Sequence, residues 1–139
     1  MPVHHFVHPD GSTNEHHINV DGKLLADPLD VIYRDGKPLV ALRAVANELG
    51  YQVSWNPKEH SAIISTSISK IIVKPNESTV IRNGLLKHIS LDTSLDTAVP
   101  AEIYQGRLYV DPEVFTLGLN EVDVMDHEIY IAPQRAYPQ

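Results

Sequence analysis

Short runs of alternating hydrophobic and polar residues fill most of this chain, and turns that contain glycine separate them. Two pairs of runs flank an Asp-Gly dipeptide: residues 18–25 around Asp21-Gly22, and residues 31–40 around Asp35-Gly36. Asp-Gly between alternating runs is a strong signal for a two-residue β-hairpin turn. Pro38 has no backbone N–H, so we expect it at the edge of its strand. Residues 18–40 therefore predict two consecutive hairpins.

The spacing becomes helical over residues 41–49. Leu42, Val45 and Leu49 recur on one face, and Gly50 suits the left-handed position just past a helix end. So short a helix is marginal alone and must pack onto a sheet. Residues 52–65 then predict a closing hairpin.

The second half repeats this order with weaker signals. Its expected elements are a strand at 70–73, a turn at 74–77, a hairpin around Asn83-Gly84, a hairpin around Gln105-Gly106, a helix start at Asp111-Pro112 and a closing hairpin at 122–131. We therefore predict an α+β, β-rich fold with two tandem copies, residues 18–67 and 68–133. Each copy has the order hairpin, hairpin, short helix, hairpin, and the two pack as one pseudo-symmetric domain. Residues 1–17 would form a flexible histidine-rich arm and residues 134–139 a tail.

Composition removes several classes of function. The chain has 139 residues, a net charge of -7 and no basic stripe, which argues against nucleic-acid binding. It has no cysteine, so disulfides, thiolate nucleophiles and zinc-thiolate sites are excluded. No apolar run reaches membrane-spanning length. The N-terminus shows no secretion signal, so the chain either stays inside the cell or has lost a leader or parent chain.

Catalytic motifs are absent from the sequence. There is no Gly-x-Ser-x-Gly element and no glycine-rich phosphate loop, and the carboxylates crowded into the second half have no diagnostic spacing. We therefore predict no catalytic residue and no cofactor.

Histidines offer two candidate metal sites. Removal of Met1 would leave Pro2-Val3-His4, whose amine, amides and imidazole form the square-planar nitrogen set that Cu(II) and Ni(II) favour, and His5 could assist. The simpler interpretation is a disordered arm. His60 and His127 each neighbour a glutamate in a closing turn, where solvated side chains are the favoured interpretation.

Arg43, Arg107, Tyr51 and Trp55 are the candidate ligand-binding residues. Arg43 would lie in the first helical turn, where the helix dipole disfavours a cation, so it needs a partner. The favoured partner is an internal carboxylate such as Asp30 or Asp35, with a carbonyl, and an external anion is the alternative. Trp55 alternates with Val53, which favours the core, although a half-exposed Trp55 beside Tyr51 could stack on a sugar ring. A pocket lined by Arg43 or Arg107 would indicate an anionic ligand.

Residues 35–55 resemble the copper amine oxidase N-terminal-like domain, also called the stalk domain. That family shows a Gly-Arg-x-x-Val-Pro-Leu-Arg block, an alanine-rich helix ending in Leu-Gly, and then x-Val-x-Trp. This chain has Gly36-Lys37-Pro38-Leu39-Val40-Ala41-Leu42-Arg43, then Leu49-Gly50, then Val53-Ser54-Trp55. The resemblance extends over residues 18–133. It is weaker in the second copy, which keeps Gly106-Arg107 but has Val124 at the tryptophan position.

The resemblance implies a non-catalytic appendage, because the copper ligands and the quinone of the oxidases lie in a different, larger domain. It implies a binding or spacer module at the surface of Gram-positive-type bacteria, in contact with wall polymer or a partner protein. The alternative is a cytoplasmic, phage-encoded protein that binds a small anionic ligand or a metal ion.

Overall fold

The computed structural model describes residues 16–25, 27–86 and 92–134. Its strands in the first half are β1 His17–Val20, β2 Lys23–Leu25, β3 Val31–Arg34, β4 Lys37–Ala41, β5 Gln52–Asn56 and β6 Ser61–Ser65. Those in the second half are β7 Ser69–Val73, β8 Thr79–Gly84, β9 Thr93–Asp96, β10 Glu102–Tyr104, β11 Arg107–Val110, β12 Val122–Val124 and β13 Glu128–Ile131. The helices are α1 Leu42–Glu48 and the 3₁₀ helices η1 Pro28–Asp30 and η2 Pro112–Gly118.

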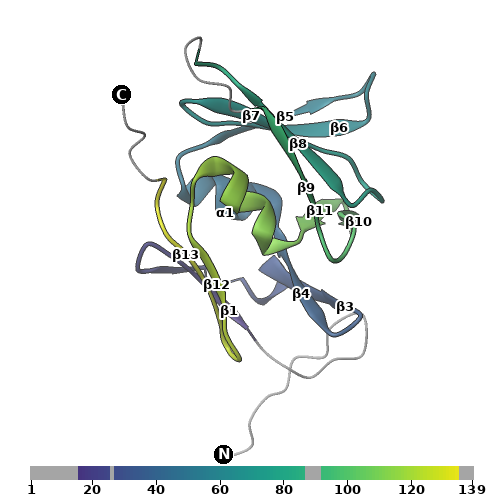
Figure 1. Cartoon of the computed structure of the whole chain (residues 1–139). Coiled ribbons are helices and arrows are strands. Elements are labelled where there is room, and N and C mark those ends of the chain that lie inside the picture. Colours follow the sequence, from purple (N-terminus) through teal and green to yellow (C-terminus); the bar gives the residue numbers. More distant parts are fainter. Residues whose placement is uncertain (1–15, 26, 87–91, 135–139) are drawn as a thin grey trace, which may run out of the picture.

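The strands form three sheets, with the orders β12-β13-β1-β2, β10-β11-β4-β3 and β5-β6-β7-β8-β9. Each sheet joins the two halves of the chain, through β1 with β13, β4 with β11 and β6 with β7. In Figure 1 the five-stranded sheet lies at the top, and the short helices lie between it and the other strands. The β-rich α+β prediction is therefore confirmed.

The symmetry between two tandem copies stays a prediction. The pair β1–β13 is parallel, whereas the pair β6–β7 is antiparallel. In the sheet β12-β13-β1-β2 and in the sheet β5-β6-β7-β8-β9, the closing hairpin of one predicted copy lies beside the first strands of the other. The relative strand direction at the junction nevertheless differs between the two sheets.

Three predicted two-residue hairpins are confirmed. The turns between β1 and β2, β3 and β4, and β10 and β11 each contain two residues with positive φ: Asp21 and Gly22, Asp35 and Gly36, and Gln105 and Gly106. Pro38 pairs with Tyr33 of β3, whereas β11 pairs only with Val40 and Ala41 of β4. The proline therefore lies where β4 has a single neighbour, as its missing N–H requires.

The hairpin predicted around Asn83-Gly84 is wrong. Both residues lie within β8, where they pair with Lys70 and Ser69 of β7. The turn predicted at 74–77 is confirmed, and it contains Asn76, which has a φ of 66°. Asn-Gly is a local turn signal, and here the ladder to β7 outweighs it. Strand β9, which the sequence pattern did not predict, pairs with β8 on its other side.

Both predicted helix starts lead into a short helix. After α1, Gly50 takes a φ of 81°, and the N–H of Leu49 donates to the carbonyl of Val45. Before η2, the Asp111 side chain accepts a 3.0 Å hydrogen bond from the N–H of Glu113, as an N-cap residue does. The second helix is 3₁₀ rather than α, and it ends at Leu119 with a φ of 62°.

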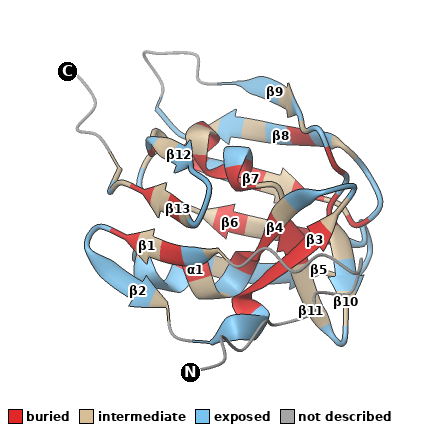
Figure 2. Cartoon of the chain, turned by 90° about the horizontal axis from the view of Figure 1, so that it is seen from below, coloured by how far each residue is buried: buried red, intermediate tan, exposed pale blue. Residues whose placement is uncertain are grey.

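A large hydrophobic cluster joins elements from both halves of the chain, and a smaller cluster with Ile32, Leu39 and Tyr109 lies beside it. The large cluster contains Leu42 and Val45 of α1, Val114 and Phe115 of η2, and strand residues such as Ile64. Buried positions gather on the inner strands in Figure 2, whereas β2 and β9 are largely exposed. Because the two halves share this core, neither half buries its apolar face alone.

Tyr51 makes a polar link inside this core. Its side chain is 7% exposed, and its hydroxyl donates a 2.7 Å hydrogen bond to Oδ1 of the buried Asn120. Asn120 in turn donates from Nδ2 to the carbonyl of Ala132 at 2.8 Å. Tyr51 is therefore in the interior and does not lie on the surface beside Trp55.

Replacement of Tyr51 by Phe should destabilise the fold. The change keeps the ring but leaves Oδ1 of Asn120 buried without its partner, which costs about 1–3 kcal/mol. Urea denaturation measures the free energy of unfolding. The matched control is Tyr130→Phe, since Tyr130 is only partly buried and no hydrogen bond of its hydroxyl is found within the described part of the chain. Equal stability of the two variants would contradict the role assigned to Tyr51.

His16 makes a second polar link, between β1 and the β12–β13 turn. Its Nε2 lies 2.8 Å from the carbonyl of Met125, so Nε2–H is the donor, and the Tyr33 hydroxyl donates to Nδ1. Burial lowers the pKa of His16 from its ordinary value of 6.5, against the raising effect of the Met125 hydrogen bond. The neutral imidazole therefore fits this position best.

Stability should consequently fall as the pH falls below 6.5. The unfolded chain, where the pKa of His16 is ordinary, then binds this proton more readily than the folded chain does. The loss continues until the pH passes the lower pKa of the folded state. We expect urea midpoints measured from about pH 7.5 to about pH 5 to decline less for His16→Gln than for the unchanged protein. The control is the exposed His60→Gln, and an identical decline in all three proteins would contradict the assignment.

Candidate functional site

A groove with a volume of about 540 Å³ opens between α1, β5 and the β10–β11 hairpin. Helix α1 contributes Arg43 and Asn47, strand β5 contributes Ser54 and Trp55, and the hairpin contributes Ile103, Arg107 and Leu108. The groove therefore brings together three of the four candidate ligand-binding residues, Arg43, Trp55 and Arg107. Tyr51, the fourth, is in the core.

Trp55 lies at the edge of the five-stranded sheet. It pairs with Ala62 of β6, which pairs with Val73 of β7, and both of these neighbours are buried. Alternation therefore placed Trp55 on the correct, inner face of the sheet. Its predicted burial in the core is wrong, because the indole is 42% exposed. Since β5 is an edge strand, its inner face at Trp55 opens onto the groove.

His60 supports the indole from one side. The imidazole and indole rings meet edge to face, with their centroids 5.0 Å apart. His60 lies in the β5–β6 turn with a φ of 51°. Edge-to-face contacts of this kind stabilise the two rings, and Trp55 remains 42% exposed beside the groove.

Arg43 lies at the start of α1 on its exposed side. It donates one long hydrogen bond, 3.5 Å, from Nη1 to the carbonyl of Val53. Within residues 16–25, 27–86 and 92–134, no carboxylate lies within 4.0 Å of its guanidinium. The favoured prediction is therefore wrong for the carboxylates Asp30 and Asp35, whereas the backbone carbonyl that it included is present at Val53. Asp30 is paired with Arg107 instead, across a distance in sequence that the local pattern did not reveal.

Asn47 and Ser54 add polar groups that the sequence interpretation missed. Asn47 follows Arg43 by four residues, so the two are neighbours on the helix surface. Ser54 and Asn47 are both exposed. The four-residue spacing of Arg43 and Asn47 was the available signal, although it could not show what faced them.

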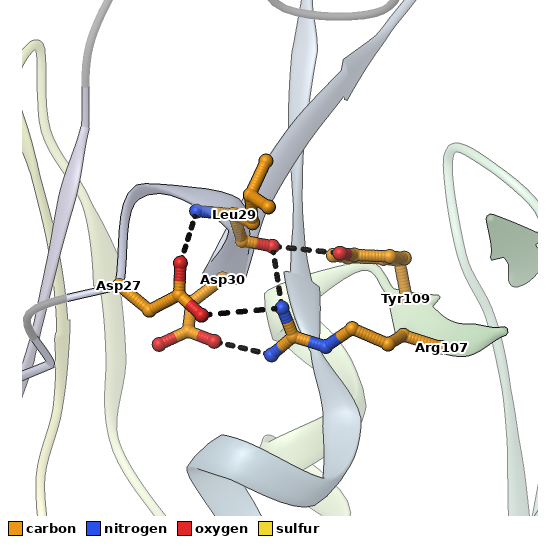
Figure 3. A network of polar contacts seen from close by, with 5 residues as sticks. All are labelled: Asp27, Leu29, Asp30, Arg107 and Tyr109. Carbon is orange, nitrogen blue, oxygen red and sulfur yellow. Dashed lines mark hydrogen bonds and ion pairs between the residues drawn. The ribbon is translucent and has the colours of Figure 1, made fainter. Parts of the chain in front are cut away.

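Arg107 is held by a network of polar contacts (Figure 3). Its Nη1 donates a 3.1 Å hydrogen bond to the carbonyl of Leu29 and lies 3.6 Å from Oδ2 of Asp27. Its Nη2 bonds to Oδ1 of Asp30, which is only 6% exposed. The hydroxyl of Tyr109 donates to the same Leu29 carbonyl at 2.6 Å. The network joins η1 to β11.

The electrostatics of this network hold Arg107 in its charged form. Burial alone would lower the pKa of Arg107, but the Asp30 hydrogen bond and the nearby acidic groups outweigh burial and raise it. Burial also raises the pKa of Tyr109. The guanidinium lies 5.6 Å from the centre of the Tyr109 ring, in cation–π range. Arg107 thus forms a fixed part of the groove wall, with its donors directed to η1.

Replacement of Arg107 by Met should lower stability by about 1–3 kcal/mol, because Asp30 would stay buried without its partner. Thermal or urea unfolding at neutral pH measures the loss. The control is Lys23→Met, which breaks the exposed Lys23–Glu48 pair and should cost less than about 1 kcal/mol. An equal loss of unfolding free energy in the two variants would show that the Arg107–Asp30 pair contributes no more than a surface ion pair.

Among the described residues, none of the histidines considered as metal ligands lines this groove. His4 and His5 lie outside the described residues. His60 and His127 are exposed. In the described part of the chain, no group of three or more histidine, aspartate or glutamate side chains is arranged to hold a metal ion.

Among the described residues, no helix is long and apolar enough to cross a membrane.

Comparison with known proteins shows to which family the chain belongs. No curated protein and no solved structure matches the chain. The model of the copper amine oxidase N-terminal domain matches residues 19–130, which include the groove, both helices that line the core and all three sheets. In those oxidases this domain is not the catalytic one. The chain therefore belongs to the copper amine oxidase N-terminal domain family.

Proposed function

We propose that this chain is a non-catalytic binding module of the bacterial cell surface, and that it holds a wall polysaccharide in the groove between α1, β5 and β10–β11. The observation that carries this proposal is Trp55, a large apolar ring that is partly exposed inside a concave surface. Membership of the copper amine oxidase N-terminal domain family supports a stalk-like module.

The chemistry of the groove suits a sugar. Ligand sites combine apolar and aromatic walls with a few polar groups that orient the ligand. Here Ile103, Leu108 and Trp55 supply apolar surface, whereas Asn47 and Ser54 supply hydrogen-bonding groups. An indole ring can cover the apolar face of a pyranose while its edge stays near water. The open groove can also admit a stretch of a longer polymer.

The same groove is poorly equipped for catalysis. Arginine is the only titratable residue type among the described residues that line it. Arginine stays protonated and does not exchange protons in the way that a general acid or base must. The described lining therefore supports binding and contains no acid–base pair.

A second candidate is a protein that binds a small anionic ligand in the same groove. Arg43 favours it, because its guanidinium has no carboxylate partner in the described part of the chain. A partner protein is a third candidate occupant. The experiment that follows distinguishes a small anionic ligand and a partner protein from a wall polysaccharide.

Replacement of Trp55 by Ala should weaken sedimentation with purified Gram-positive cell walls by at least about tenfold in Kd, since the stacking surface is lost. The measurement is the fraction of protein that co-sediments at increasing wall concentration, with circular dichroism to check folding. Leu24→Ala is the control, because Leu24 is 56% exposed on β2 and does not line the groove. Walls stripped of protein exclude a protein partner. Unchanged sedimentation of Trp55→Ala, or none by the unchanged protein, would contradict the proposal.

A further inference from the structure

The two arginines of the groove differ in how far the protein itself already occupies their guanidinium groups. Arg107 donates to the Leu29 carbonyl and to Asp30, and Asp27 lies 3.6 Å away. Its charge is therefore neutralised by the protein itself. Arg43 has only the 3.5 Å contact with the Val53 carbonyl. In a chain with a net charge of -7, Arg43 is the group of the groove that can take an external anion.

The side-chain chemistry of Arg43 favours a carboxylate. The arginine fork matches a carboxylate with two parallel hydrogen bonds. Asn47, on the next turn of the same face, can donate to or accept from a neighbouring hydroxyl or acetamido group. Trp55 lies across the groove on β5.

We propose that the ligand of this groove is a saccharide that carries a carboxylate. Arg43 binds the carboxylate, Trp55 covers the sugar ring, and Asn47 bonds to a polar ring substituent. Arg107 shapes the wall and does not touch the carboxylate. One uncompensated guanidinium matches the single negative charge of one carboxylate. This assignment rests on the proposed function and names the ligand class for the same site.

Trp55 is the chain's only tryptophan, so its fluorescence reports on the groove directly. The probe is the wall disaccharide of N-acetylglucosamine and N-acetylmuramic acid, which has a free lactyl carboxylate. Its matched control is N,N′-diacetylchitobiose, which has similar rings without the carboxylate, and glucose 1-phosphate tests a phosphate instead. Each sugar is titrated while the Trp55 emission is recorded. The acidic disaccharide should reach half of its maximal change in emission at the lowest concentration. We expect its Kd to be at least about tenfold below that of the other two sugars.

Variants locate the carboxylate. Arg43→Gln should weaken binding of the acidic disaccharide by at least about tenfold and leave chitobiose binding unchanged. Arg43→Lys keeps the charge but loses the planar fork. Its affinity for the acidic disaccharide should therefore lie between those of the unchanged protein and of Arg43→Gln. The control is Lys70→Gln, which removes an exposed positive charge from a strand that does not line the groove and should bind as the unchanged protein does. Thermal unfolding checks that each variant is folded.

Several results would overturn the carboxylate assignment: equal affinity for the acidic and neutral disaccharides, tighter binding of the phosphate, no change in Arg43→Gln, or no response to any sugar. Sedimentation with cell walls then tells the two proposals apart. If the unchanged protein still binds walls through Trp55, the assignment of the ligand class fails and the proposed function is retained. If wall binding is also absent, both fail.

Discussion

The antiparallel pairing of β4 with β11 is the constraint on which the rest of the structure depends. It joins the two halves through only two pairs, Val40 with Val110 and Ala41 with Tyr109, and all four residues are buried. Helix α1 begins directly after β4, and the β10–β11 turn directly precedes β11. The same pairing therefore brings Arg43 and Arg107 into the lining of one groove.

Polar groups at the margins of the core strengthen this arrangement. A buried carboxylate such as Asp30 is costly unless it is paired and hydrogen-bonded, and Arg107 supplies both kinds of contact from the other half of the chain. Tyr51 and Asn120 make a similar link between the connection that follows α1 and the connection that follows η2. The contacts of Arg107 with η1 make it a structural residue of the groove. Arg43 has only its contact with the Val53 carbonyl and lies on the exposed side of α1.

The groove itself follows from the edge position of β5. An inner-face side chain in the middle of the sheet, such as Ala62 of β6, which pairs with Trp55, is buried. The corresponding position on β5 lacks a strand beyond it, so Trp55 is partly exposed where the helix and the β10–β11 hairpin leave space. The groove is thus formed where α1, β5 and the β10–β11 hairpin leave space between them.

The sequence by itself determined the elements whose causes are local. Asp-Gly turns, the helical stripe with Gly50 behind it and the Asp111-Pro112 helix start all depend on neighbouring residues, and all were predicted correctly. Only the tertiary structure decided that Asn83-Gly84 extends a strand, that Trp55 faces a groove, and that Asp30 pairs with Arg107 and not with Arg43. The reason is physical, since strand ladders, burial and ion pairs depend on partners far away in the chain, and a local pattern does not contain their positions.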